Sequence, residues 1–282
     1  MNILTLDIED WYNCYFPDGN SDWDSYEVRI DKGVDLILEE LEKRGLKATF
    51  FCLGWVAEKN PGVVKRIDRN GHQIGFHTYK HQLLSFIGRE GFKRETEKSK
   101  NLFGEITGKS LTAFRAPGFS VTSATKWAFE VLAETGFEVD CSVFPAHNGY
   151  GGLPGYGSGI PKRIDVNGYI LKEFPVNTAR VAGREFAFSG GGYFRLLPFP
   201  LIRFWGSHTD YMMTWFHPRD FDVNQPTISG LPLKNRFKTR VGLQGAFHKW
   251  QRLLDEFDFV DLRAADLLTD WENTPLLHLH DL

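Results

Sequence analysis

The sequence predicts an α/β fold in which parallel strands are joined by helices. Two observations support this prediction. Short apolar runs alternate with longer segments of helical periodicity through the first half of the chain, and several of those longer segments end at glycine. This alternating order is typical of a parallel sheet with helical crossovers. Repeated this many times, it indicates either a barrel or a doubly wound sheet.

Apolar runs of roughly three to seven residues are expected to form the strands. They are residues 2–6, 47–53, 73–76, 111–114, 137–139, 211–216 and 259–262. Between them, apolar residues recur three and four positions apart, which predicts helices. The expected helices are residues 33–44, 61–69, 89–107, 123–135 and 243–257, with a last helical turn at 263–269. Pro61 begins one of them, and Gly45 and Gly108 follow two others, as helix ends usually do.

The 282 residues are expected to form a single domain, residues 1–282, because no internal repeat and no long linker divides them. The pattern changes at about 144–200, where glycine and proline become frequent. This stretch is predicted to be an elaborated loop region with a short hairpin at 162–166 and 169–175.

Composition excludes some functions. The net charge of −3 gives no basic surplus, so nucleic acid is not an expected partner. Aromatic residues make up 15% of the chain, which suits a packed core and also a groove for sugar rings. Cys14, Cys52 and Cys141 are far apart and form no CxxC pair, so buried reduced thiols are expected rather than disulfides or a zinc ribbon.

The N-terminus begins directly with the first apolar run and has no basic segment followed by a signal-length apolar stretch. The best candidate for a membrane span, residues 194–216, is interrupted by arginine, proline and aspartate. We therefore expect a cytoplasmic protein, with peripheral contact at the inner membrane face left open.

Acidic and histidine residues follow two of the predicted strands. Asp7, Glu9 and Asp10 come after the first, and His77 and His81 after the third. A spacing of four would place both imidazoles on one face of a helical turn, and two histidines with one carboxylate commonly hold a catalytic zinc. Each group alone also fits an ordinary surface turn.

Three more residues of functional type stand at predicted strand ends. Arg115, Asp140 and His217 follow the strands at 111–114, 137–139 and 211–216. The carboxyl ends of parallel strands meet at one edge of the fold, where active sites lie. Residues of functional type thus follow five of the predicted strands. Chance would explain one or two such cases more easily than all five.

These positions resemble the motifs of the polysaccharide deacetylases of carbohydrate esterase family 4, the NodB-homology domain. The family motif Thr-Phe-Asp-Asp resembles Thr5-Leu6-Asp7 followed by Glu9 or Asp10. The others are matched by His77-Thr78-Tyr79-Lys80-His81, by Arg115-Ala116-Pro117, by Asp140-Cys141-Ser142 and by His217. Order and spacing agree over roughly residues 3–220. Residues 7–11, 189–193 and 216–218 resemble a bacterial subgroup linked to exopolysaccharide and surface-glycan biosynthesis.

The resemblance implies a distorted, TIM-like (β/α)7 barrel and a set of roles. Asp7 would be the general base, with Arg115 holding it. Asp10, His77 and His81 would bind a divalent metal, with Zn²⁺ as the expected ion and Glu9 as the alternative to Asp10. Asp140 would orient and charge His217, the general acid. The family's adjacent aspartates are separated here, and Gly118 stands where many members have tyrosine.

The expected activity is metal-dependent hydrolysis of an N-acetyl group on a sugar, with release of acetate. The N-acetylated sugar would belong to a glycan or to its nucleotide- or lipid-linked precursor. The alternatives are an amidase acting on a small non-sugar amide or ureide, a non-catalytic glycan-binding protein, and a protein whose Asp and His are only structural.

Two further segments bear on the substrate. Backbone N–H groups of residues 189–193 could meet a diphosphate, although a flexible turn is the preferred interpretation. The aromatic run at 199–216 could rest on a membrane, although core packing is preferred for most of it.

Overall fold

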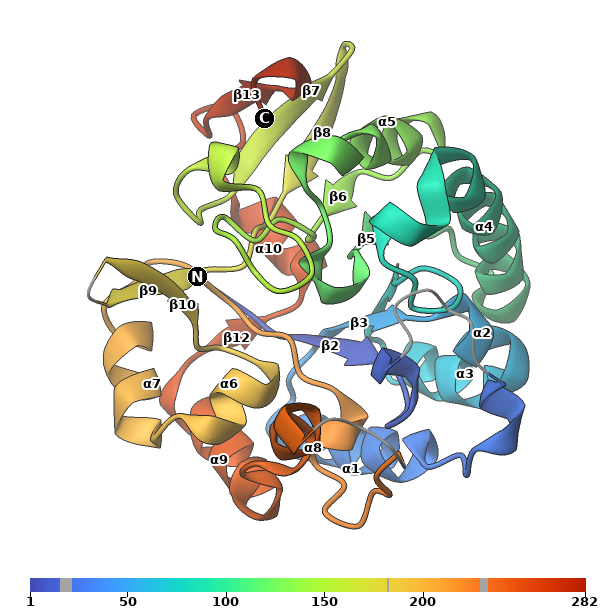
Figure 1. Ribbon diagram of the computed structural model, residues 1–282, viewed down its shortest axis with the longest axis vertical. Helices are drawn as coiled ribbons and strands as arrows, with labels where there is room; N and C mark the ends of the chain where they lie inside the picture. Colours follow the sequence, from blue (N-terminus) through green and yellow to red (C-terminus); the bar gives the residue numbers. More distant parts are fainter. Residues whose placement is uncertain (16–21, 182, 229–232) are drawn as a thin grey trace.

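The computed structural model describes residues 1–15, 22–181, 183–228 and 233–282 (Figure 1). One sheet has the strand order β13-β7-β8-β6-β5-β4-β3-β2, and a second has the order β11-β1-β12. The strands are β1 (Asn2–Ile3), β2 (Thr5–Ile8), β3 (Thr49–Cys52), β4 (Gln73–Phe76), β5 (Ala113–Phe114), β6 (Val139–Asp140), β7 (Lys162–Val166), β8 (Tyr169–Glu173), β11 (Met212–Met213), β12 (Phe259–Val260) and β13 (Leu276–His278). The seven predicted runs all contain strands.

The two sheets form a distorted barrel. Strands β2, β3, β4, β5, β6 and β8 pair in parallel one after another. On the other side of β2, Leu6 forms a parallel bridge with Phe216, just after β11. Between β8 and β11 no described strand pairing closes the ring. There, the Asn177 side chain accepts a hydrogen bond from the Met213 backbone, at 2.9 Å. The ring has seven strand positions if β1 and β2 are counted as one, and the other six are β3, β4, β5, β6, β8 and β11.

Helices cover the outside of this barrel (Figure 1). They include α1 (Ile30–Arg44), α3 (Pro61–Arg69), α4 (Leu84–Thr107), α5 (Trp127–Glu134), α9 (Leu243–Glu256) and α10 (Leu262–Leu268). All were predicted, most to within a few residues. Helix α4 begins earlier than expected, but Gly88 interrupts it with φ 69° and ψ 166°, so the regular part starts at the predicted Arg89.

The region at 144–200 contains more structure than a loop with one hairpin. The predicted hairpin is present as β7 and β8, which pair antiparallel. The unpredicted elements are β9 (Thr178–Val181), β10 (Arg184–Ala187), α6 (Gly191–Leu196) and α7 (Phe199–Gly206); α2 (Gly54–Lys59) and α8 (Leu233–Arg240) were also missed. These elements have four to eight residues each, too few for periodicity to reveal.

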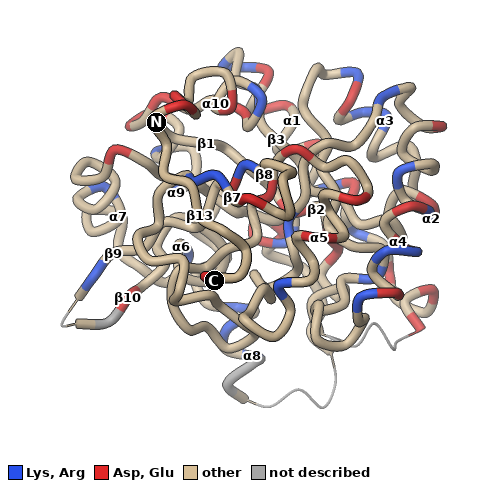
Figure 2. Tube along the Cα trace, turned by 90° about the horizontal axis from the view of Figure 1, so that it is seen from above, with Lys and Arg blue, Asp and Glu red and all other residues tan. Residues whose placement is uncertain are grey.

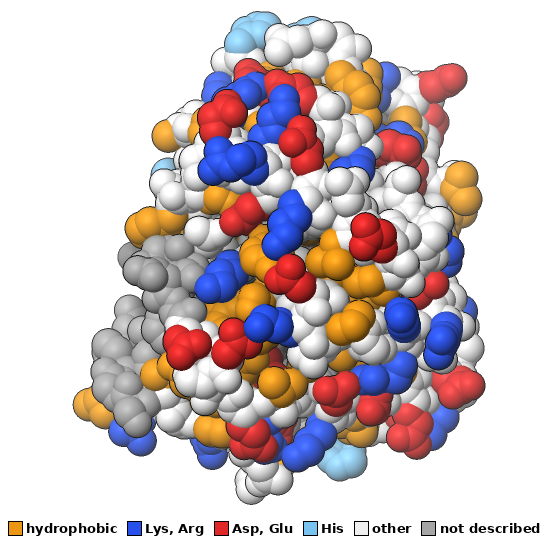
Figure 3. Space-filling model, turned by 90° about the vertical axis from the view of Figure 1, so that its right-hand side faces the viewer, with side chains coloured by type: hydrophobic (Ala, Val, Ile, Leu, Met, Phe, Trp, Pro, Cys, Tyr) orange, Lys and Arg blue, Asp and Glu red, His pale blue; other side chains and the backbone are white. Residues whose placement is uncertain are grey.

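The core is rich in aromatic rings, and the aromatic run at 199–216 belongs mostly to it. Phe199, Tyr211, Trp215 and Phe216 are buried, whereas Phe204 is exposed. Core packing, the preferred interpretation, is therefore confirmed for most of the run. Figure 3 shows acidic and basic side chains interspersed on one face. No helix in the described part of the chain is long and apolar enough to cross a membrane.

Candidate active site

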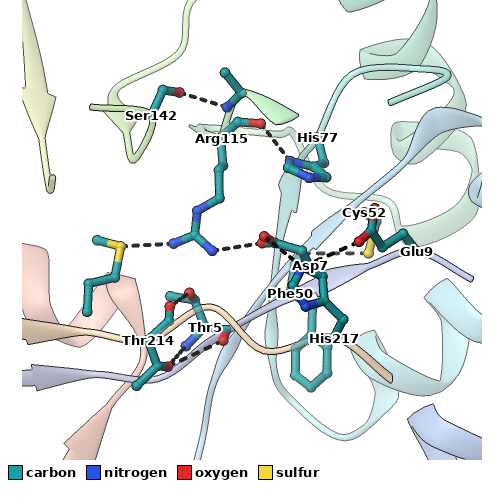
Figure 4. A network of polar contacts seen from close by, with 12 residues as sticks. Thr5, Asp7, Glu9, Phe50, Cys52, His77, Arg115, Ser142, Thr214 and His217 are labelled. Atoms are coloured by element: carbon teal, nitrogen blue, oxygen red, sulfur yellow. Dashed lines mark hydrogen bonds and ion pairs between the residues drawn. The ribbon is translucent and has the colours of Figure 1, made fainter. Parts of the chain in front are cut away.

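The predicted site residues gather at one end of the barrel. Asp7 lies within β2, His77 and Arg115 directly follow β4 and β5, and His217 comes four residues after β11. All four are buried. Figure 4 shows the Asp7 carboxylate between Arg115 and His217, with His77 above it and Glu9 beside it. Parallel strands explain this convergence, because their carboxyl ends share one edge.

Asp7 and Arg115 form a buried ion pair. Nη1 of Arg115 donates to Oδ1 of Asp7 at 2.7 Å, so the predicted contact is present. The guanidinium also lies 4.2 Å from the centre of the Phe51 ring, and its Nη2 meets the Met213 sulfur at 2.8 Å. The second Asp7 oxygen is 3.9 Å from Nε2 of His217. Arg115 therefore fixes one carboxylate oxygen and leaves the other directed toward His217.

Glu9, His77 and His81 form a cluster that suits a metal ion. One potential ligand atom from each lies within 4.8 Å of the other two. Nδ1 of His77 donates to the Arg115 carbonyl at 2.7 Å, which leaves Nε2 for an ion. Nδ1 of His81 is buried and has no hydrogen-bond partner in the described chain. Two imidazoles and a carboxylate are a usual set for zinc.

Asp10 does not join this cluster, so the expected placement is corrected in favour of Glu9. The Asp10 carboxylate accepts hydrogen bonds from the backbone N–H groups of Trp11, Arg29 and Ile30, at 2.7 to 3.0 Å. It thereby satisfies donors at the start of α1, where a carboxylate is favourable. Burial raises the pKa of Asp10 to about 6 despite these hydrogen bonds. The Asp10 carboxylate therefore stabilises the start of α1 rather than a metal ion.

The two histidines do not lie on a helical turn, which corrects a second expectation. Residues 77–83 are irregular, and Thr78 and His81 have left-handed φ angles of 61° and 52°. The rings still approach, with centroids 5.2 Å apart and edge to face. Left-handed backbone at non-glycine residues is uncommon and concentrates at functional sites. The strained turn, rather than helical spacing, brings the imidazoles together.

Two imidazoles and a guanidinium surround Glu9. His81 contacts it at 2.9 Å, Arg219 at 3.2 Å and His217 at 3.3 Å. Burial alone would raise the pKa of Glu9, but the charges of His81, Arg219 and His217 outweigh it and hold the pKa well below its ordinary value. Burial lowers the pKa of His77 to about 4. Near neutral pH the cluster thus offers a carboxylate and a neutral imidazole, the forms that bind metals.

Asp220, not Asp140, holds His217. Nδ1 of His217 donates to Oδ2 of Asp220 at 2.8 Å, and the His217 backbone N–H donates to the same oxygen at 3.0 Å. The other Asp220 oxygen is 3.0 Å from Nε of the buried Arg195. Burial alone would raise the pKa of Asp220, but His217 and Arg195 hold it below its ordinary value. The sequence could have indicated this pair, because Asp220 stands only three residues after His217.

Asp140 instead pairs with a neighbouring carboxyl group. Parallel β6 and β8 place Asp140 opposite Glu173, and the two side chains share a hydrogen bond. Ser142 Oγ donates to Asp140 at 2.5 Å and accepts from the Ala116 backbone at 2.8 Å. Burial raises the pKa of both carboxyl groups, most strongly that of Glu173. Asp140 thus supports the segment after Arg115 rather than His217.

We expect Glu173→Gln to flatten the dependence of stability on pH. Because the Glu173 pKa is raised, the folded protein keeps a proton that the unfolded chain releases above its ordinary carboxyl pKa. The free energy of unfolding therefore falls as pH rises toward the raised pKa, by about 1.4 kcal/mol per pH unit for one proton. Glutamine can still accept from the Val143 N–H and donate to Asp140 without titrating.

Urea denaturation between pH 5 and pH 8 measures this effect, with the exposed Glu138→Gln as the matched control. The Glu173 variant should have the shallower slope, and the control should follow the unchanged chain. Equal slopes for all three proteins would show that the buried pair holds no extra proton.

Gly190 and Gly191 pack on Trp215 beside the site and lead into helix α6, so the preferred flexible turn is wrong. Gly190 makes a parallel bridge to Trp215, and a Cβ atom there would come within 2.4 Å of the Trp215 carbonyl oxygen. Gly191 has φ 51°, and its Cβ would lie 3.7 Å from the His217 ring. Glycine is needed here because the backbone packs directly on Trp215, two residues before His217.

Two family models match this chain in succession. Residues 21–139 match the one described as polysaccharide deacetylase, and residues 141–266 match a domain of unknown function, DUF3473. Residues 21–139 thus belong to the polysaccharide deacetylase family. The first match ends within β6, so both matched parts contribute strands to one barrel, and His77 and His217 come from different parts.

Curated relatives of this chain include deacetylases of sugar polymers. A peptidoglycan-N-acetylglucosamine deacetylase of Bacillus cereus is 34% identical over 128 residues, which are 43% of this chain and 46% of the relative. A chitin deacetylase of Pestalotiopsis is 34% identical over 106 residues, 36% of this chain and 35% of the relative. The chain spans about half the length of the curated relatives it matches, or less.

Solved structures agree on the fold. A Mycobacterium smegmatis protein, described as a candidate polysaccharide deacetylase, has a TM-score of 0.63 at 18% identity, over 97% of this chain and 91% of its own. The peptidoglycan deacetylase PdaC of Bacillus subtilis has a TM-score of 0.50 at 12% identity, over 95% and 90%. These likenesses concern the fold alone, and the predicted distorted (β/α)7 barrel is confirmed.

Proposed function

We propose that this deacetylase hydrolyses the N-acetyl group of a sugar, with a divalent metal held by Glu9, His77 and His81. The observation that carries the proposal is the metal-ligand cluster directly beside Asp7 and His217. We propose zinc as the ion, because imidazole and carboxylate ligands with an open position suit it. When bound, such an ion supplies Lewis acidity that polarises an amide carbonyl and makes water easier to deprotonate.

The protein's own residues supply the proton transfers. Asp7, with one oxygen fixed by Arg115, accepts the proton of the attacking water on its other oxygen. His217 donates a proton from Nε2 to the leaving nitrogen, because its Nδ1 side is bonded to Asp220, which stabilises the imidazolium. The base and the acid lie 3.9 Å apart and so face the same reacting group. The products are acetate and an amino sugar.

We propose an N-acetylhexosamine as the substrate, within a glycan or as a nucleotide- or lipid-linked precursor in the cytoplasm. The named relatives act on peptidoglycan N-acetylglucosamine and on chitin, which supports the sugar class. A role in surface-polysaccharide assembly is part of the proposal. Peripheral membrane contact would be supported by α8, which lies at the edge of the molecule (Figure 2). That helix exposes Leu233 and Phe237 and ends in basic residues.

The proposal is tested by acetate release from a panel of N-acetylglucosamine oligomers and nucleotide- and lipid-linked N-acetyl sugars. Each is measured with and without added zinc. We expect metal-dependent release from at least one donor, lost in the His77→Ala/His81→Ala variant, whose metal content should also fall. The exposed His248→Ala variant is the matched control.

The alternatives give different outcomes. Protein that holds metal but releases no acetate from any donor would favour a small non-sugar amide as substrate. Protein that binds sugar but holds no metal and releases no acetate would favour a glycan-binding function. A double histidine variant that loses only stability, without any specific activity to lose, would favour structural roles for these residues.

A further inference from the structure

The loop at 144–153 is a well-built structure beside the active site. Asn148 Oδ1 accepts the backbone N–H groups of Tyr150 and Gly151, each at 2.7 Å. The Leu153 N–H donates to the Phe144 carbonyl at 2.8 Å, which closes the base of the loop. These bonds fix the loop from within, so the side chain at its tip is held in a defined place.

The loop is also joined to the segment that follows Arg115. The Gly152 N–H donates to the Val121 carbonyl at 2.9 Å. A Cβ atom on Gly151 would lie 2.8 Å from Cα of Ser120, a distance that no real side chain tolerates. Glycine permits this close approach of two backbones. The loop is therefore packed directly against the segment that follows Arg115.

Tyr150 projects from this loop over Gly118. The Tyr150 Cβ and Cδ2 atoms lie 3.2 Å from the point where a Gly118 side chain would begin. Gly118 has φ 59°, and it is three residues after Arg115. The tyrosine ring thus covers the place where many family members carry their own tyrosine. A residue from a distant loop fills the space that Gly118 leaves.

The ring is not merely a cover for Gly118. Tyr150 is 58% exposed, although it stands on a fixed loop. Burial of its phenol raises the Tyr150 pKa, and the charges of Cys14, Arg219 and Glu9 also act on that pKa. Much of this aromatic side chain is thus open to solvent, beside the segment that follows Arg115.

We propose that Tyr150 is a stacking platform for a pyranose ring of the substrate. The C–H face of a sugar packs on an aromatic ring, and a side chain already held by a fixed loop loses little conformational entropy on binding. The ligand class is an uncharged face of a hexosamine, next to or part of the N-acetylated unit. This inference rests on the proposed function, because the sugar it binds is the substrate.

The test compares Tyr150→Ala with Tyr150→Phe, using N,N′,N″-triacetylchitotriose as the probe. Loss of the ring should raise KM about tenfold and leave kcat within about twofold, since the ring binds but transfers no proton. Phenylalanine keeps the stacking face and should retain KM within about threefold. The exposed Phe204→Ala on α7 is the matched control and should change neither constant.

Binding measured by calorimetry in the Asp7→Asn background separates this inference from the proposed activity. We expect the Tyr150→Ala change to weaken trisaccharide binding about tenfold there as well. Trisaccharide binding that depends on Tyr150, without acetate release from any donor of the panel by the unchanged enzyme, would remove the proposed activity and leave the platform. Acetate release with KM and Kd unaffected by Tyr150→Ala would overturn the platform alone. No trisaccharide binding and no release from any donor of the panel would overturn both.

Discussion

Replacing Asp7 by asparagine is expected to lower kcat about 10³-fold while the metal stays bound. A positioned general base contributes roughly 10²- to 10⁴-fold to the rate, and asparagine cannot accept the proton of the attacking water. Asparagine has the shape of aspartate, and its oxygen can still accept the Arg115 hydrogen bond that now measures 2.7 Å. The lost function is therefore proton transfer rather than placement.

The measurement is steady-state acetate release, together with zinc content by elemental analysis. Zinc content should match that of the unchanged protein, because Asp7 is not one of the three clustered residues. The buried Arg115 loses its anionic partner in this variant, so stability is expected to fall, and thermal unfolding must show a folded protein at the assay temperature. A folded, metal-loaded variant with more than a tenth of normal kcat would show that another group is the base.

Much of the barrel could be predicted because its strands and helices follow simple local rules. Helix 61–69 and strand 73–76 were predicted with the bounds that the structure has. The short elements were missed for a physical reason. Helix α6 begins in a run of glycines, which have low helix propensity, and it forms because Gly190 and Gly191 pack on Trp215.

The site was predictable where a residue lies at the end of a strand or shortly after it, and less so where tertiary contacts decide. Asp7, His77, Arg115 and His217 are brought together because the fold places strand ends at one edge. Glu9 and Asp10 are both acids near the end of β2. Backbone N–H groups at the start of α1 bind the Asp10 carboxylate, and Glu9 is left beside the two histidines. Likewise, Asp140 lies beside Glu173 because β6 pairs with β8, and the sequence does not reveal this pairing between distant residues.

The pairing of His217 with Asp220 leads to a second large effect. Asp220→Asn is expected to lower kcat by roughly 10²- to 10⁴-fold, as occurs when a buried aspartate behind a catalytic imidazole is neutralised. Asparagine can still accept the Nδ1–H, but it no longer stabilises the imidazolium that donates the proton. It also leaves Arg195 without its anion. Asp140→Asn is the matched control, and its kcat should stay within about threefold.

The pH profile distinguishes a role in proton transfer from a role in folding. If Asp220 stabilises the protonated His217, the alkaline limb of kcat/KM moves to lower pH in Asp220→Asn, because the acid loses its proton more readily. A variant that is merely less stable would lose activity without moving that limb. In Asp140→Asn the limb should stay in place, since Asp140 bonds to Ser142 and Glu173. A limb that moved only in the Asp140 variant would restore the assignment expected from the family motif.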